Sequence, residues 1–317
     1  MKIAVLDAKT LGEDIDLSPF LEFGETRIFG KTDEDELDTN IGDADVVIFN
    51  KIKFNEKTVK NPESIKLVCV TATGFDNIDL EFCRKNNIAV CNIVGYSTDS
   101  VAQVTVATAL ALVNHILEYD EFSKSGKYSK SGSANRVTPV YHEVSGMTWG
   151  IVGCGNIGRK VLKVAEAFGA KTLVYKKTPD ASLNCVDLDT LLKESDIVSV
   201  HTPLNDETRN LIDENKLSLM KKTAVLVNVS RGAVVSEEAV VKAIENGELG
   251  GFGADVFTKE PYPEDHVFVR LKDYKNVILT PHMAWGSYEA RQRCIYEICK
   301  NIKSYISGGV RNRIEGK

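Results

Sequence analysis

Apolar residues along the chain gather in short runs that are hydrophobic on both faces, and these runs alternate with stretches at helical spacing. Strands of a parallel sheet have this pattern because helices cover both faces. The pattern predicts an α/β fold with doubly wound parallel sheets. The predicted strands are 2–7, 45–50, 65–71, 88–93, 148–153, 171–176, 196–201, 223–229, 251–257 and 276–281.

Two long helical stretches stand out against these short runs. Residues 97–126 open with Ser, Thr and Asp, which favour N-caps, and end at Gly126. Residues 287–309 open with Ser287 and end at a pair of glycines. Both are predicted to be single helices.

These helices bracket a region that carries its own nucleotide motif. The bracketing predicts a discontinuous substrate domain, residues 1–98 and 288–317, and an inserted dinucleotide-binding domain, residues 99–287. Two Rossmann-like domains with two crossings predict a cleft between them, a common place for a small-molecule site. The polar, Ser/Gly-rich segment 124–139 is predicted to be a loop.

Composition narrows the function classes. The 317 residues are 43% hydrophobic and 26% charged, with a net charge of −6, so no broad attraction to nucleic acid or an anionic membrane is implied. We expect no signal peptide in "MKIAVLD" and no membrane span. Seven cysteines without a CxxC pair indicate reduced thiols in a cytoplasmic protein, and no metal site is expected.

A glycine-rich loop follows the predicted strand 148–153. In "GIVGCGNIG", Gly153 allows a tight turn, Gly155 lets backbone approach a pyrophosphate, and Gly158 lets the next helix pack closely. The N–H groups at the helix start, around Asn156 and Ile157, then face the phosphates. The context predicts dinucleotide binding.

The next strand ends in "YKKTP", where many such domains carry a carboxylate for the ribose of NAD. Ammonium groups would instead attract a 2′-phosphate. We therefore predict that NADP(H) is preferred over NAD(H), through Lys176 and with help from Lys177 and Thr178. The alternative is that these lysines are ordinary solvated charges.

Three strand ends further along each present a reactive side chain: Arg231, Glu260 and His282. The carboxyl ends of strands line the ligand crevice in such sheets. Reduction of a 2-oxo acid needs a proton donor, for which histidine is suited, and a carboxylate to orient it. It also needs a planar cation for the substrate carboxylate, which arginine supplies. The three residues form a complete set for that reaction.

Seven segments spread over nearly the whole length are together highly specific, and the chain resembles the D-isomer-specific 2-hydroxyacid dehydrogenase family. Two of them, "GYSTDSVAQ" and "HMAWGS", are most similar to its glycerate dehydrogenase, or hydroxypyruvate reductase, branch. The segments are "TATGFDNID" (71–79), "VGYSTDSVAQ" (94–103), "GIVGCGNIG" (150–158), "VSVHTPLNDETRNLI" (198–212), "LVNVSRGAVV" (226–235), "GADVFTKEP" (253–261) and "PHMAWGS" (281–287).

The resemblance implies a role for each residue of the set. Arg231 would bind the substrate carboxylate and 2-oxo group, and His282 would be the general acid in reduction and the base in oxidation. Glu260 would pair with His282 and raise its pKa. Further expected contacts are Thr73 and Gly74 to the substrate carboxylate, Trp285 as a wall of the substrate pocket, Asp255 near the nicotinamide amide, Val229 beside its ring, and His201 and Pro203 along the cofactor.

The resemblance implies an enzyme that reduces 2-oxo acids to D-2-hydroxy acids with NAD(P)H. Val104 departs from the polar residue often found in the hydroxypyruvate branch, and Ile52 and Phe54 suggest a pocket for a larger apolar acid as an alternative to hydroxypyruvate or glyoxylate. Another alternative is a nucleotide-sensing corepressor of the same fold. The resemblance also implies a homodimer, with the small and apolar residues of the helix from about Ser100 as a candidate face.

Overall fold

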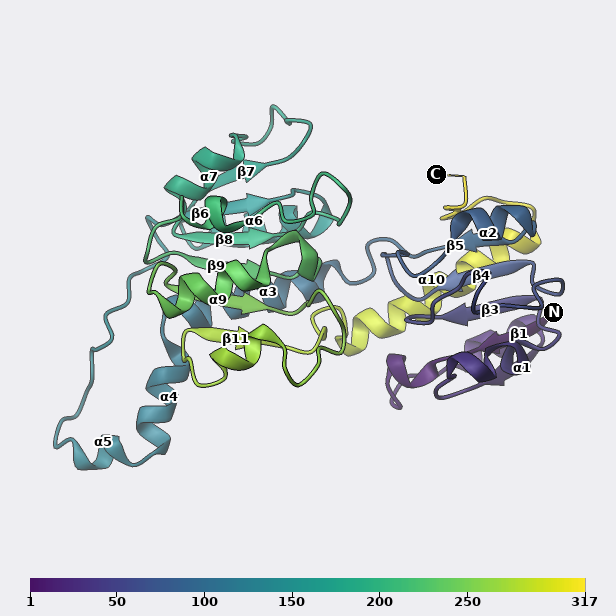
Figure 1. Ribbon diagram of the computed structural model, residues 1–317, viewed down its shortest axis with the longest axis horizontal. Coiled ribbons are helices and arrows are strands. Elements are labelled where there is room, and N and C mark those ends of the chain that lie inside the picture. Colours follow the sequence, from purple (N-terminus) through teal and green to yellow (C-terminus); the bar gives the residue numbers. More distant parts are fainter. Residues whose placement is uncertain (317) are drawn as a thin grey trace. The chain divides into compact units, whose positions relative to one another are not determined.

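The computed structural model describes residues 1–316, which form two compact units (Figure 1). One unit contains Met1–Ser97 and the described residues from Gly286 onward, and the other is Thr98–Trp285. Each unit is built around one parallel sheet, which confirms the predicted α/β fold.

The first unit has a five-stranded sheet in the order β2-β1-β3-β4-β5, with every neighbouring pair parallel. Strand β2 was not expected from the sequence, because it is an edge strand whose residues are half-buried or exposed and so lack a buried apolar run. The strands are β1 (Lys2–Val5), β2 (Glu25–Ile28), β3 (Val46–Phe49), β4 (Leu67–Val70) and β5 (Ala89–Cys91).

The second unit has a six-stranded parallel sheet in the order β11-β10-β9-β8-β6-β7. Its strands are β6 (Thr148–Val152), β7 (Lys171–Tyr175), β8 (Ile197–Val200), β9 (Val225–Asn228), β10 (Gly251–Ala254) and β11 (Val277–Leu279). All six fall within predicted strand segments.

Both sheets are doubly wound about their first strand. In the first unit β1 lies between β2 and β3, and in the second β6 lies between β7 and β8. The chain thus leaves the first strand on one side and returns on the other. In such sheets the crevice at the carboxyl ends of the two diverging strands is the usual ligand position.

The helices follow the predicted pattern with two corrections. The stretch 97–126 is not one helix, because His115 takes a left-handed conformation (φ 50°) and the chain bends by 65° there. The predicted loop 124–139 also contains the short helix α5. The α-helices are α1 (Leu37–Ile41), α2 (Leu80–Lys85), α3 (Thr98–Val113), α4 (Ile116–Lys124), α5 (Lys127–Lys130), α6 (Asn156–Ala167), α7 (Leu188–Glu194), α8 (Glu214–Leu217), α9 (Glu237–Glu245) and α10 (Tyr288–Ile306).

Short 3-10 helices complete the chain: η1 (Ala8–Leu11), η2 (Ser18–Phe23), η3 (Glu34–Glu36), η4 (Gly232–Val234) and η5 (Val267–Leu271). Among residues 1–316, no single helix is long and apolar enough to cross a membrane. The bent pair α3–α4 passes that test only when its two parts are taken together.

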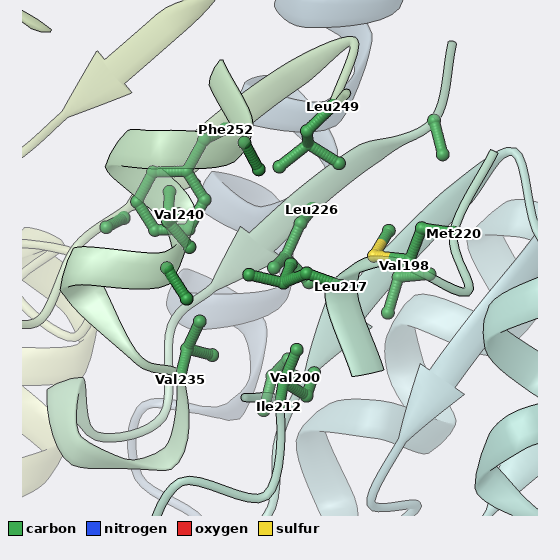
Figure 2. Packing of buried hydrophobic residues seen from close by; sticks show 14 of the residues in the cluster. Val198, Val200, Ile212, Leu217, Met220, Leu226, Val235, Val240, Leu249 and Phe252 are labelled. Atoms are coloured by element: carbon green, nitrogen blue, oxygen red, sulfur yellow. The ribbon is translucent and has the colours of Figure 1, made fainter. Parts of the chain in front are cut away.

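The largest core cluster lies on one face of the second sheet (Figure 2). Val198, Val200 and Leu226 point from the strands, and Val240 of α9 meets them. These side chains are fully buried, and each contributes about 1.5–3 kcal/mol of transfer free energy. This packing fixes the strand ends from which the functional loops emerge.

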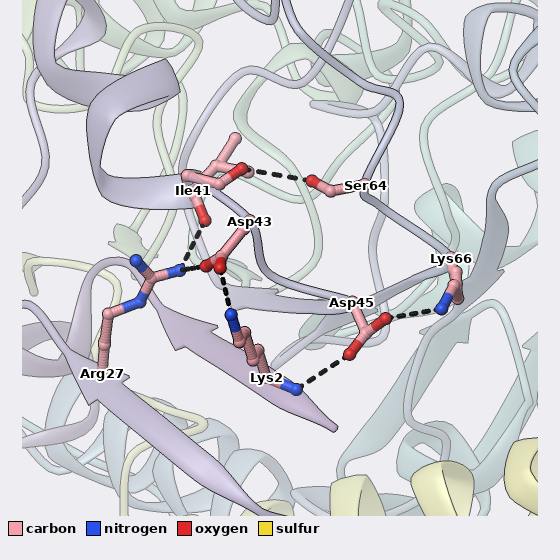
Figure 3. A network of polar contacts seen from close by, with 8 residues as sticks. Lys2, Arg27, Ile41, Asp43, Asp45, Ser64 and Lys66 are labelled. Atoms are coloured by element: carbon pink, nitrogen blue, oxygen red, sulfur yellow. Dashed lines mark hydrogen bonds and ion pairs between the residues drawn. The ribbon is translucent and has the colours of Figure 1, made fainter.

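A network of exposed ion pairs joins the amino end of the first sheet (Figure 3). Asp43 pairs with Lys2 and with Arg27, and Asp45 accepts from the Lys2 backbone N–H and pairs with Lys66. The charges nearly balance, and exposed pairs of this kind contribute little individually. We assign the network to the stability of this edge and not to a binding site.

Candidate active site and nucleotide-binding loop

The glycine loop follows β6 at the point where the second sheet diverges. Gly153 has φ +90°, and a Cβ there would lie 2.8 Å from the Thr202 backbone nitrogen, so no other residue fits without strain. A Cβ on Gly158 would lie 2.3 Å from the Gly153 carbonyl oxygen. These two glycines therefore permit close packing of the loop, α6 and the segment after β8.

Gly155 differs from its neighbours. A Cβ there would meet nothing within 4 Å, so packing does not require glycine. Gly155 is the N-cap of α6, and no side chain caps the first N–H groups, which belong to Asn156, Ile157 and Gly158. An open space in front of uncapped helix N–H groups fits a bound pyrophosphate.

His201 flanks this loop at the end of β8. Ser199 Oγ accepts from Trp149 Nε1 at 3.0 Å and also lies 3.0 Å from His201 Nε2. His201 Nδ1 is a buried atom without a hydrogen-bond partner among residues 1–316. Burial lowers the pKa of His201 to about 3, so the ring is neutral. A buried ring nitrogen without a partner beside the loop also fits a bound cofactor that would complete its hydrogen bonding.

Three cations lie around the loop: Arg159 on α6, and Lys176 and Lys177 directly after β7. Arg159 is paired with Asp180 at 2.6 Å, and that contact helps to hold the pKa of Asp180 far below its usual range, after the hydrogen bonds from Ser182. Lys177 is paired with Glu207 at 2.6 Å. The half-buried Lys176 has no ion-pair partner in the described part of the chain, so it is the cation left uncompensated here.

The structure brings Glu260 and His282 together. Arg231, Glu260 and His282 follow the adjacent strands β9, β10 and β11. One Glu260 oxygen, Oε2, lies 2.6 Å from His282 Nδ1, and the other accepts the Phe257 backbone N–H at 3.0 Å. The imidazole is therefore oriented through Nδ1, which leaves Nε2 as the nitrogen that can hold a proton for a reacting atom.

Asp255 supports the turn that carries His282. Its carboxylate accepts the Thr280 hydroxyl at 2.5 Å and the backbone N–H groups of Met283 and Ala284 at 2.9 and 2.8 Å. Burial raises the pKa of Asp255, and these hydrogen bonds oppose the rise. His282 itself has φ 53°, a left-handed conformation that this clamp stabilises. The sequence did not reveal this supporting contact.

Asn228 holds the backbone of Arg231 in place, and it is a second supporting residue that the sequence did not reveal. Asn228 is buried; its amide donates to the Arg231 carbonyl at 3.0 Å, and its Oδ1 accepts from the Ser230 N–H and hydroxyl. Directly after Arg231, a Cβ on Gly232 would lie 2.0 Å from the Phe257 carbonyl carbon. The loops of Arg231 and Glu260 are therefore in backbone contact.

The remaining predicted residues lie in different surroundings. In the first unit Thr73 is exposed beside Gly74, its hydroxyl donates to the Ile93 carbonyl at 2.7 Å, and its carbonyl accepts from Asn92. In the second unit Pro203 is exposed, whereas Val229 and Trp285 are half-buried. No group of three or more His, Cys, Asp or Glu side chains suited to a metal occurs within residues 1–316.

One expectation about the substrate pocket is wrong. Phe54 does not line a pocket, because it is fully buried in the core of the first unit, stacked on Phe49 at 5.5 Å and edge-on to Phe82. Ile52 only packs against that core from its rim. The two residues therefore do not form an apolar wall together.

A glycine loop for a dinucleotide, together with an arginine, a glutamate and an oriented histidine that follow the three neighbouring strands β9, β10 and β11, defines an NAD(P)-dependent oxidoreductase. Residues 106–284 match the family described as "D-isomer specific 2-hydroxyacid dehydrogenase, NAD binding domain". The chain belongs to this family of D-isomer specific 2-hydroxyacid dehydrogenases. It is an enzyme that acts on the CH–OH group of 2-hydroxy acids and on the corresponding 2-oxo acids.

Individual relatives agree with this assignment. The chain is 38% identical to a glyoxylate reductase of Thermococcus litoralis, with 81% of this chain and 79% of the relative aligned. It is 32% identical to a hydroxypyruvate reductase of Blautia hydrogenotrophica, over 97% and 98% of the two chains. The D-lactate dehydrogenase from Aquifex aeolicus, complexed with NAD and lactic acid, is similar in structure over the full length of both chains, with a TM-score of 0.86 and 30% identity.

Proposed function

We propose that this enzyme reduces short 2-oxo acids, hydroxypyruvate or glyoxylate, to the D-2-hydroxy acids and prefers NADPH as the hydride donor. The observation that carries the catalytic part is the 2.6 Å contact between Glu260, which follows β10, and His282, which follows β11. Strand β10 is also the neighbour of β9, which Arg231 follows. Relatives named for glyoxylate and hydroxypyruvate support short substrates, and the burial of Phe54 removes one support for a larger apolar acid.

Each residue has one task in this proposal. The Arg231 guanidinium binds the substrate carboxylate, because its planar fork matches two carboxylate oxygens. Thr73 and Gly74 contribute to the same carboxylate from the first unit, and Trp285 limits the size of the substrate. His282 holds the proton at Nε2 and delivers it to the substrate oxygen, while Glu260 keeps the ring oriented through Nδ1.

The cofactor would be held by the second unit. Gly153, Gly155 and Gly158, with the N–H groups of Asn156 and Ile157, would bind the pyrophosphate. His201, Pro203, Val229 and Asp255 would lie along the rest of the cofactor. Bound NAD(P)H would supply the hydride, and Lys176 would attract a 2′-phosphate, with Lys177 joining once it leaves Glu207.

A substrate panel run with each cofactor tests both parts of this proposal. We expect the highest kcat/KM for hydroxypyruvate or glyoxylate with NADPH, above phenylpyruvate and 2-oxoisocaproate. Lys176→Asp should reverse the cofactor preference toward NADH, while Lys163→Asp, an exposed charge on α6, should not. A preference for NADH in the unaltered enzyme would overturn the cofactor assignment. Tight cofactor binding without turnover on any 2-oxo acid would favour a corepressor.

We also propose a cytoplasmic homodimer that uses the segment from α3 to the start of β6. Figure 1 shows α4 and α5 extending away from the second sheet. Exposed apolar side chains gather on this segment, and Tyr141 and Met147 line a hollow of about 680 Å³ beside it. The exposed residues are Ile116, Leu117, Tyr128, Val137, Val140 and Tyr141. Sedimentation analysis tests this, since Val137→Asp with Val140→Asp should yield monomers.

A further inference from the structure

A second carboxylate–imidazole pair is buried behind the loop that carries Glu260. Glu237 is the first residue of α9 and is 8% exposed. Its Oε1 accepts the Thr258 backbone N–H at 2.8 Å, and its Oε2 lies 3.2 Å from His266 Nε2. One carboxylate therefore holds the loop from Thr258 to His266 at both of its ends.

The tautomer of His266 follows from its other contact. The Phe268 backbone N–H donates to His266 Nδ1 at 3.3 Å, so Nδ1 lacks a proton and Nε2–H donates to Glu237. The ring is also packed on three sides by Tyr262, Phe257 and Phe268, with centroids 4.7, 6.3 and 5.2 Å away. It cannot turn to make a different contact without losing both bonds.

Glu260 lies between these two anchors. Its Oε1 accepts from the N–H of Phe257, the residue directly before Thr258, so the anchor at Thr258 also fixes the donor that orients Glu260. The backbone of Phe257 also packs tightly against Gly232, the residue that follows Arg231. Glu237 thus ties together the two loops that carry the reactive side chains.

We propose that Glu237, held by His266, is a positioning residue for Glu260 and through it for His282. This inference rests on the proposed function, in which Glu260 orients the proton donor. The charge of Glu237 is not required at the substrate. Its two separate oxygens are required, because each accepts from one part-buried donor, and the two donors lie at opposite ends of the loop.

Glu237→Gln tests this, because a carboxamide has one acceptor oxygen for two donors. If the side-chain N–H of the new glutamine faces His266, then His266 Nε2 must accept that hydrogen bond and the ring proton must move to Nδ1. The Nδ1 proton would then point at the backbone N–H of Phe268, which now donates to Nδ1. We expect kcat to fall about 10- to 100-fold, with KM and the cofactor Kd changed less than about threefold. Glu238→Gln is the matched control, since Glu238 is the exposed next residue of α9, and it should leave kcat unchanged.

A double-mutant cycle separates positioning from a general structural effect. If Glu237 acts through Glu260, then Glu237→Gln in a Glu260→Gln background should cost less than about twofold further in kcat. Losses that multiply in the double variant would overturn the positioning role. An unchanged kcat in Glu260→Gln alone would instead refute the proposed function.

His266→Asn gives a second variant that guards against misfolding. Asparagine can still accept the Phe268 N–H as an N-cap, but it loses the bond to Glu237. We expect it to reproduce the fall in kcat with a thermal midpoint close to that of the unaltered enzyme. Unchanged kcat in both folded variants, Glu237→Gln and His266→Asn, would overturn the proposal.

Discussion

The two units use the same strand order around their first strand but treat the crevice there in opposite ways. In the second unit the strand β6 ends in a glycine loop with open space at Gly155. In the first unit Asp7 follows β1 and is 7% exposed. Its carboxylate accepts the backbone N–H groups of Asn50 at 2.9 and 3.0 Å and of Lys51 at 2.8 Å, just after β3.

The first unit therefore fills its own crevice with a carboxylate. The backbone donors that could meet a ligand anion there are already used, and the negative charge would repel a phosphate. The second unit keeps its helix N–H groups uncapped and excludes side chains from the space before them. The occupant of the crevice, and not the doubly wound fold, therefore decides which unit binds a nucleotide.

The largest effect is expected from giving the second unit the feature of the first. Gly155→Asp places a carboxylate in the open space, at a backbone conformation that any residue adopts and at an N-cap position that favours Asp. The thermal midpoint should be unchanged or higher, while NAD(P)H binding weakens at least about 100-fold through charge repulsion. Fluorescence titration with NADPH measures this. Binding within tenfold of the unaltered enzyme would show that the pyrophosphate lies elsewhere.

Removing the support beneath the open crevice should have the next largest effect. Ser199→Ala leaves the buried Trp149 N–H without its acceptor and frees His201 Nε2. We expect a loss of about 1–3 kcal/mol in the free energy of unfolding, measured with denaturant. Thr190→Ala, which removes an exposed hydroxyl partner of Asp187, is a control that should cost less. An unchanged unfolding midpoint in Ser199→Ala would contradict this hydrogen-bond arrangement.

Asp7 allows a pH test of the filled crevice. Burial raises its pKa above the ordinary 3.8, and the backbone hydrogen bonds from Lys51 and Asn50 oppose this. As pH rises from about 4 toward the raised value, the unfolded chain loses the proton first, so stability falls over that interval. Asp7→Asn removes this titration. The free energy of unfolding of the variant, relative to that of the unaltered chain, should therefore be higher at pH 7 than at pH 4, by about 1 kcal/mol or less. Denaturant unfolding at the two pH values measures this difference. If the unaltered chain instead gains stability relative to the variant between pH 4 and pH 7, the pKa of Asp7 is not raised in the folded protein.

The smallest effect concerns the pair Lys177–Glu207 at the end of β7. Glu207→Gln frees Lys177 for a 2′-phosphate, but both side chains are exposed and such pairs are weak. We expect NADPH to bind about two- to threefold more tightly, with NADH as the internal control because it lacks that phosphate. An equal change for both cofactors would assign Glu207 to general loop structure.

Sequence patterns predicted much of this architecture because buried parallel strands leave a strong apolar signal. Apolar runs predicted strands β6 and β8, and the glycine spacing predicted the loop from Gly153. The pairing of Glu260 with His282 was expected from the family resemblance. The break at His115 was not found, since a left-handed residue leaves no apolar signature. The burial of Phe54 was also missed, because periodicity does not tell core from pocket.

The supporting polar residues were hidden for a different reason. Asp7, Asn228 and Glu237 act by accepting or donating hydrogen bonds to backbone groups, and Asp7 and Glu237 reach partners 43 and 21 positions away. Such contacts depend on tertiary geometry and not on any local pattern. The sequence shows only that a polar residue stands at the start or end of an apolar run. It does not show which backbone group that residue contacts.

The most direct test of the account is the kcat for hydroxypyruvate reduction by His282→Gln, with the NADPH Kd measured on the same sample. Glutamine keeps a hydrogen-bonding side chain beside Glu260 but cannot deliver a proton. We predict that kcat falls between about 10² and 10⁴-fold while the cofactor Kd stays within about twofold. A kcat within tenfold of the unaltered enzyme, with cofactor binding intact, would contradict the assignment of proton transfer to the Glu260–His282 pair.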